Sequence, residues 1–230
     1  MRYRARSRVR VVVMSPPCSR FGGWSYLNRT IHPESWRERR NEDEIIAKFC
    51  GDVAIAQYDD QLDWLLEQPA SSDLKQLQPW PRILADERTE QVVFDQCQCG
   101  ARTKEGHNIK KPTRLTASSG DLIYYFQDLQ CGSTKMCQGQ HITLTGRRAD
   151  EARIWPWMFA RRVAWGIMRL CAHKRSVSVS TGGPGAVSVS TGGATRHFPT
   201  ATSFVPGVNR IGEGTATVLD DEIPFFQGAS

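Results

Sequence analysis

The sequence lacks the features that would place it in several common classes of protein. The run from Val9 to Met14 is too short for a signal-peptide core, and no stretch approaches the roughly 18 apolar residues needed to cross a bilayer. No P-loop, dinucleotide-binding turn or Ser-His-Asp order is present. The seven cysteines are an odd number at irregular spacing, which argues against a disulfide scaffold. We therefore expect free thiols in a reducing, intracellular compartment.

Acidic residues are missing from the N-terminus, where none precedes Glu34. The formal net charge of +6 includes an alternating arginine series from Arg2 to Arg10. We assign residues 1–8 to a basic arm, which suits phosphate contacts but is equally typical of a solvated leader, a strand edge or a misplaced gene start.

Tryptophan is missing from the C-terminal part, since none follows Trp165. There, the segment Val177–Gly183 recurs word for word at residues 187–193 in a Gly/Ser/Thr-rich context. Two copies are too few for a solenoid, so this composition predicts a linker or disorder. We expect a globular domain over residues 9–172, and a low-complexity, disordered tail over 173–230.

What the sequence contains, up to residue 171, is an alternation of strand-like and helix-like segments. Short β-branched or alternating runs predict strands, and apolar residues at helical spacing predict helices. Strands are expected at 9–14, 62–67, 91–95, 113–118 and 141–145, and helices at 34–59 (with a possible break near Gly51), 72–78, 122–129 and 152–171. This order predicts an α/β fold, with a mostly parallel sheet and flanking helices.

Cys18 follows the first predicted strand. The buried run ending at Met14 is followed by Ser15, Pro16 and Pro17, whose prolines fix φ and turn the chain abruptly. Cys18 is thereby presented beyond the carboxyl end of a strand, where α/β sheets carry their active residues. The alternative is that Cys18 is a small buried hydrophobe.

Glu67 ends the second predicted strand, which Pro69 stops. In a parallel sheet the ends of these two strands meet at one edge, so Glu67 and Cys18 would face one cleft. A thiolate can add to an electron-poor ring while a carboxylic acid protonates a ring nitrogen. Alternatively, Glu67 only ends a strand.

Ser15-Pro16-Pro17-Cys18 resembles the Pro-Cys nucleophile motif of cytosine-C5 DNA methyltransferases, and Leu65–Pro69 resembles their next strand, whose glutamate contacts cytosine N3. A closer resemblance is to methyltransferase-like segments of copia-type retroelement polyproteins. The further matching residues are Trp24, Leu27-Asn28, Asp95–Gly100, Lys111-Pro112-Thr113, Cys137 with His141, and Trp155-Pro156. The resemblance covers roughly residues 9 to 170.

The resemblance implies a partial Rossmann-like domain in which Cys18 attacks C6 of a flipped cytosine and Glu67 protonates N3. Ser15, Pro16 and Pro17 would form the substrate loop, and S-adenosylmethionine would donate the methyl group. DNA and other polyprotein segments would be the partners, without a membrane, and a protein acting on DNA would be nuclear.

The sequence departs from that family in its cofactor region. The family binds S-adenosylmethionine at a glycine-rich turn after an earlier strand, but no glycine precedes Val11. Its Gln-x-Arg-x-Arg element has only a partial match in the charges of Lys111 and Arg114. We therefore expect a truncated or inactive fragment, with S-adenosylmethionine bound only if a missing N-terminal part is supplied. The alternatives are a non-enzymatic nucleic-acid-binding remnant, which the basic second half favours, and a structural domain.

Four cysteines and a histidine raise the question of a metal. Their spacings, C-x-C followed by C-x5-C-x3-H, are not those of common zinc fingers, so our prediction is no metal and thiols that pack beside strands. The weak candidates for ligands are Cys97, Cys99, Cys131, Cys137 and His141.

Overall fold

The computed structural model describes residues 9–23, 25–132, 137, 140–142, 144 and 152–180, with side chains up to Arg175. The expected basic arm at 1–8, Trp24 and the part of the expected tail from residue 181 onward lie outside the described residues.

Four strands form one mixed sheet in the order β1-β2-β4-β3. The strands are β1 (Val11–Met14), β2 (Asp63–Pro69), β3 (Glu90–Asp95) and β4 (Pro112–Ala117). β1 and β2 pair in parallel, whereas β4 is antiparallel to both of its neighbours. The α/β class is confirmed, but the expectation of a mostly parallel sheet is wrong. No crossover helix separates β3 from β4, so the chain returns in the opposite direction.

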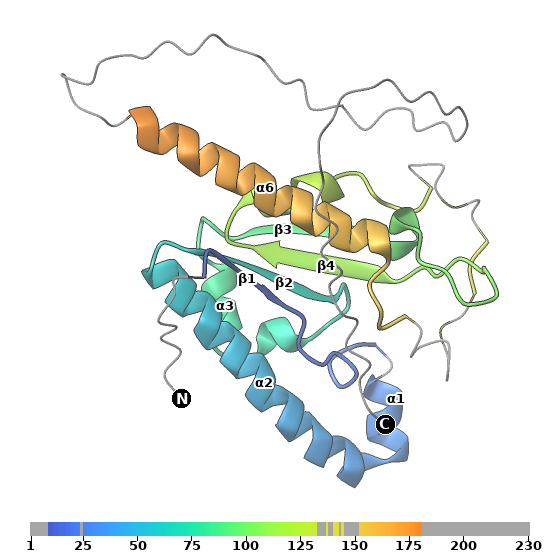
Figure 1. Ribbon diagram of the computed structural model, residues 1–230. Helices are drawn as coiled ribbons and strands as arrows, with labels where there is room; N and C mark the ends of the chain where they lie inside the picture. Colours follow the sequence, from blue (N-terminus) through green and yellow to red (C-terminus); the bar gives the residue numbers. More distant parts are fainter. Residues whose placement is uncertain are drawn as a thin grey trace, which may run out of the picture. The chain divides into compact units, whose positions relative to one another are not determined.

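Helices cover both faces of this sheet (Figure 1). α2 (Pro33–Asp59) and α3 (Trp80–Leu84) pack on one face, while α4 (Gly120–Ile123) and α6 (Trp157–Ser180) pack on the other. β2 contributes side chains to both layers. Leu65 packs in the hydrophobic core beneath α6 (the α6 core), and Leu66 packs in the core beneath α2 (the α2 core). The short elements are α1 (Ser25–Ile31), η1 (Leu74–Gln76), η2 (Gln96–Cys99) and η3 (Tyr124–Phe126).

Gly51 does not break α2, contrary to the expected weak point. A Cβ at this position would lie 2.6 Å from the ring of Pro79, so the glycine lets the segment before α3 approach the helix closely. Trp80 then donates an indole hydrogen bond to the carbonyl of Ala47 at 2.9 Å. The glycine therefore serves packing between helices rather than a kink.

Three further elements differ from expectation. α1 forms between residues 19 and 33, where no helix was expected, and of the helix expected at 72–78 only the short η1 forms, with α3 beginning after it at Trp80. The strand expected at 141–145 is not formed by the described residues 141, 142 and 144.

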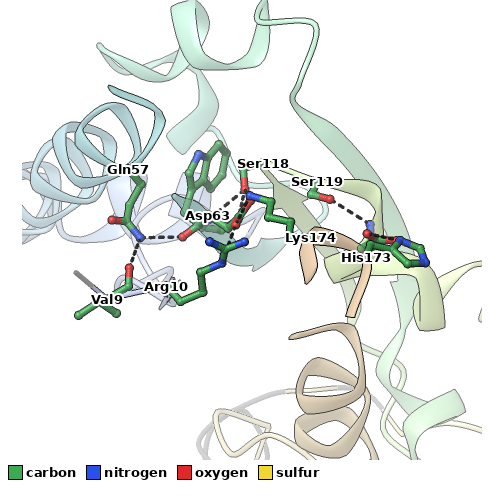
Figure 2. A network of polar contacts seen from close by, with 10 residues as sticks. Val9, Arg10, Gln57, Asp63, Ser118, Ser119, His173 and Lys174 are labelled. Carbon is green, nitrogen blue, oxygen red and sulfur yellow. Dashed lines mark hydrogen bonds and ion pairs between the residues drawn. The ribbon is translucent and has the colours of Figure 1, made fainter. Parts of the chain in front are cut away.

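α6 continues to Ser180 and so includes the first residues of the expected tail. His173 and Lys174, at the start of this part of the helix, each contact a carboxylate of the domain (Figure 2). The Lys174 ammonium lies 2.7 Å from Oδ2 of Asp63, and Nδ1 of His173 lies 2.8 Å from Oδ2 of Asp121. Composition describes only neighbouring residues, whereas these contacts connect residues far apart in the sequence. The start of the expected tail was therefore placed too early.

Asp63 is the centre of the polar network drawn in Figure 2. Its carboxylate accepts a hydrogen bond from Ser118 at 3.2 Å and pairs with Lys174 and, at 3.8 Å, with Arg10. Gln57 of α2 donates to the carbonyls of Asp63 and Val9. The network therefore fastens both helical layers to the amino ends of β1 and β2.

Candidate functional site

The loop from Ser15 to Cys18 follows the carboxyl end of β1, and side chains of β2 form hydrogen bonds to it. Gln68 donates a hydrogen bond to the carbonyl of Pro16 at 2.9 Å, and its own amide oxygen accepts one from Ser72 at 3.0 Å. The Cys18 carbonyl accepts hydrogen bonds from the backbone N–H groups of Phe21 and Gly22, both at 3.1 Å. Cys18 is therefore placed by hydrogen bonds on both sides of it in the chain.

Glu67 is buried directly beneath this loop, with 4% of its surface exposed. Ser15 donates a hydrogen bond to Oε2 at 2.6 Å. The second oxygen, Oε1, has no hydrogen-bond partner among the described residues, and its nearest cation is the Lys111 ammonium at 3.7 Å. Burying a carboxylate whose second oxygen accepts no hydrogen bond lowers the stability of the fold. Such groups are typical of sites where a substrate supplies the missing hydrogen bond.

Lys111 and Arg114 are separated by the pleat of β4. The Lys111 ammonium pairs with Glu67 and donates to the carbonyl of Ala152 at 3.1 Å. Arg114 lies opposite Gln68 in the β2–β4 register, whereas Leu115 lies opposite Glu67. Alternation of side chains therefore directs Arg114 to the other face of the sheet, away from Glu67. Of the two candidate cations, only Lys111 reaches the site.

Lys111 and Glu67 both influence the pKa of the Cys18 thiol. Burial raises the pKa of the Cys18 thiol above its usual value of 9.0, the Lys111 ammonium opposes this rise, and the Glu67 carboxylate adds to it. Arg153 also lowers the pKa. The resting group at neutral pH is therefore a thiol, whose ionisation depends on the balance between Lys111 and Glu67.

A polar depression of about 370 Å³ adjoins the loop that carries Cys18. Pro17 and Ser19 form part of its wall, and charged side chains form the rest: Arg20, Arg39, Glu42, Asp43 and Arg153. Arginine side chains are well suited to bind phosphate oxygens, and here they share the wall with the carboxylates of Glu42 and Asp43.

A second group of chemically active side chains lies beyond the end of β3. Ligand atoms of Cys97, Cys131, Cys137 and His141 all lie within 4.8 Å of one another. Cys99, the fifth candidate from the sequence, does not join them, because it is packed in the α6 core.

Three residues that contact the Cys18 loop or the cysteine and histidine group were not predicted from the sequence. Gln68 supports the Pro16 carbonyl, Arg153 acts on Cys18, and Gln98 contacts two sulfur atoms of the second group. The position of Gln68 immediately after Glu67 offered a signal, since one residue along a strand turns a side chain to the opposite face. Arg153 gave none, because Cys18 is distant in the sequence, and neither did Gln98, whose shorter contact is with the distant Cys137.

Comparison of the chain with protein-family models, with curated proteins and with solved structures gave no match. Within the described part of the chain, no helix has the length and apolar character needed to cross a bilayer.

Proposed function

We propose that the carboxyl edge of β1 and β2 is a pyrimidine-binding, nucleophile-bearing site of the cytosine-C5 methyltransferase-like kind, in a domain of retroelement origin. The observation that carries this proposal is the position of Glu67. Its buried carboxylate is held by Ser15, in the same loop as the nucleophile, and lies close enough to Cys18 to change the pKa of its thiol.

The chemistry assigned to these residues is a reversible addition. The Cys18 sulfur forms a bond to C6 of cytosine, and the electron pair of the C5–C6 double bond shifts onto the ring. The proton of the Cys18 thiol passes to the Glu67 carboxylate, which delivers it to N3, so the number of protons is unchanged. The resulting enamine takes a proton from water at C5, and C5 then releases the hydrogen it first carried to the solvent. Return of the N3 proton to Glu67 and expulsion of the sulfur restore cytosine. The Lys111 ammonium stabilises the negative charge of both the Cys18 thiolate and the Glu67 carboxylate.

Methyl transfer is not assigned to the residues of this chain. β1 is the first strand that the structure describes. The depression beside Cys18 is lined by ionic side chains, which do not suit the adenine ring of S-adenosylmethionine. β1 is also an edge strand of the described sheet, with Val13 39% exposed. A complete methylation reaction would need a cofactor-binding segment beyond the described residues, and we derive no step through the cofactor.

The test is exchange of tritium from C5 of cytosine in DNA into water, measured without S-adenosylmethionine. Exchange requires addition at C6, protonation at C5 and loss of the tritium from C5, but no methyl donor. We expect the unaltered chain to release tritium, Cys18→Ser to release none, and Glu67→Gln to be slower by about 100-fold or more, the usual contribution of a general acid.

The matched control is Cys171→Ser, which alters a partly exposed thiol of α6 and should leave the rate unchanged. If the unaltered chain gives no exchange, or if Cys18→Ser exchanges as fast as the unaltered chain, the proposal is wrong.

The second candidate is nucleic-acid binding without catalysis, favoured by the three arginines around the depression beside Cys18. It predicts DNA binding that weakens steeply with salt, with no tritium release. Replacing Arg20 and Arg39 together by glutamine would then weaken binding, whereas Cys18→Ser would not affect it.

A further inference from the structure

Three sulfur atoms and one imidazole nitrogen meet at the end of β3. Sγ of Cys131 lies 3.4 Å from Sγ of Cys137, and Nε2 of His141 lies 3.4 Å from Sγ of Cys137 and 3.6 Å from Sγ of Cys131. Sγ of Cys97 completes the group, in which all four atoms lie within 4.8 Å. Cys97 is 1% and Cys137 is 7% exposed.

These separations match those of ligands around a tetrahedral zinc ion. Zinc binds sulfur at about 2.3 Å and imidazole nitrogen at about 2.0 Å, so neighbouring ligand atoms lie about 3.5 to 3.8 Å apart. Both sulfur–nitrogen distances are close to the tetrahedral value, the Cys131–Cys137 sulfur–sulfur distance is about 0.4 Å shorter than it, and the Cys97 sulfur lies within 4.8 Å of the other three atoms. Ordinary packing of thiols does not require a histidine nitrogen to face two sulfur atoms at once.

The surroundings suit a site with three thiolates, which would carry a net negative charge when zinc is bound. Gln98, fully buried, points its amide nitrogen at Sγ of Cys137 at 3.1 Å and at Sγ of Cys97 at 3.7 Å. Such N–H donors stabilise thiolate ligands and fix their orientation. The Lys110 ammonium lies 3.9 Å from Asp95, whose carboxylate accepts a hydrogen bond from the backbone N–H of Cys131 at 2.8 Å.

The apolar packing around this group is small in the part of the chain that the structure describes. Ala101, Ile109 and Ala152 are buried there, with Ile142 and Leu144 partly buried against them. Small apolar clusters of this kind are commonly supplemented by a bound metal. A metal here would connect the end of β3 to the segment that leads toward Ala152, whose carbonyl holds Lys111.

We propose that Cys97, Cys131, Cys137 and His141 form a structural zinc site that fastens the segment containing residues 131–141 to the end of β3. All four positions of a tetrahedral ion are filled by the protein, so the site is closed and has no place for a substrate. This proposal is independent of the chemistry assigned to Cys18.

The test is metal content and cobalt substitution of the full chain. We expect one equivalent of zinc after purification without chelator. Cobalt(II) should give the absorption of a tetrahedral ion together with sulfur-to-cobalt charge transfer. Cys97→Ser, Cys131→Ser and Cys137→Ser should each weaken zinc binding by about 100-fold or more, beyond the losses caused by outer-sphere changes.

Cys99→Ser is the matched control, because Cys99 lies in the same short helix as Cys97 but points into the α6 core. It should keep one equivalent of zinc, as should Cys171→Ser. His141→Cys separates a ligand from a packing residue: a ligand role predicts retained metal and stronger charge transfer from a fourth thiolate.

Two results would overturn the zinc site. One is absence of zinc and of charge transfer after reconstitution of the reduced, folded chain. The other is a Cys131–Cys137 disulfide, seen as a mass loss of two hydrogens, in a chain that binds no metal.

Discussion

β2 carries a buried carboxylate at each end, and the two are held in opposite ways. Asp63 at the amino end and Glu67 at the carboxyl end lie four residues apart, about 13 Å along the strand, on the face that meets α6. They are similarly buried, at 3% and 4% exposed. Asp63 contacts Ser118, Lys174 and Arg10, whereas Glu67 has one hydrogen bond from Ser15, an unused oxygen and a more distant cation.

This difference separates a structural carboxylate from a candidate functional one. The contacts of Asp63 join β1, β2, β4 and α6, so they contribute to stability in the absence of any ligand (Figure 2). Glu67 is buried with its hydrogen-bonding capacity incompletely used, which lowers stability unless a ligand completes it. Only the end of β2 that bears Glu67 also bears a nucleophile, at the end of the neighbouring β1.

The largest expected effect is on stability and concerns Asp63. Asp63→Ala should lower the free energy of unfolding by about 2 to 3 kcal/mol, because it removes charged hydrogen-bond partners from a buried position. Glu67→Gln should change it by no more than about 0.5 kcal/mol, since loss of the ion pair is offset by loss of a buried charge. Urea unfolding of the two variants measures both quantities. Equal losses would show Glu67 to be as structural as Asp63.

A smaller effect is expected on the reactivity of Cys18 toward iodoacetamide. Because the pKa of its thiol is raised above 9.0, the rate should increase from pH 7 to beyond pH 9. Lys111→Met removes the cation that opposes this rise, so the pKa should increase further and the rate at pH 8 should fall by about tenfold. Glu67→Gln should change the rate in the opposite direction.

Lys174→Met is the control for this measurement, because Lys174 pairs with the carboxylate at the other end of β2. Labelling of Cys18, followed by peptide mass spectrometry, should be unaffected by it. A rate that Lys174→Met slows as much as Lys111→Met would mean that the two ends of β2 are not electrostatically separate.

Local sequence patterns were sufficient for β1, β2 and the loop between Met14 and Cys18, because their signals are contiguous. A β-branched run followed by two prolines defines the end of a strand whatever the rest of the chain does. The direction of β4 was not predictable in this way, since parallel and antiparallel strands have the same local pattern. Likewise, Arg114 was grouped with Lys111 by proximity in sequence, and only the register of β4 separates them.

The cysteine and histidine group illustrates a different limit. Its spacing gave no recognisable pattern because Cys97 lies in η2, just after β3, whereas Cys131, Cys137 and His141 come from a later segment. Convergence of this kind depends on tertiary structure. Conversely, the contacts of His173 and Lys174 with Asp121 and Asp63 join residues far apart in the sequence, which composition cannot reveal.

The most direct test of the central claim is a covalent adduct between Cys18 and DNA in which 2-pyrimidinone replaces one cytosine, a ring that accepts a thiolate at C6 without a methyl donor. We expect a complex that survives denaturation, maps by mass spectrometry to the peptide containing Cys18, and is lost in Cys18→Ser but not in Cys171→Ser. Absence of any adduct, or an adduct formed through another cysteine, would contradict it.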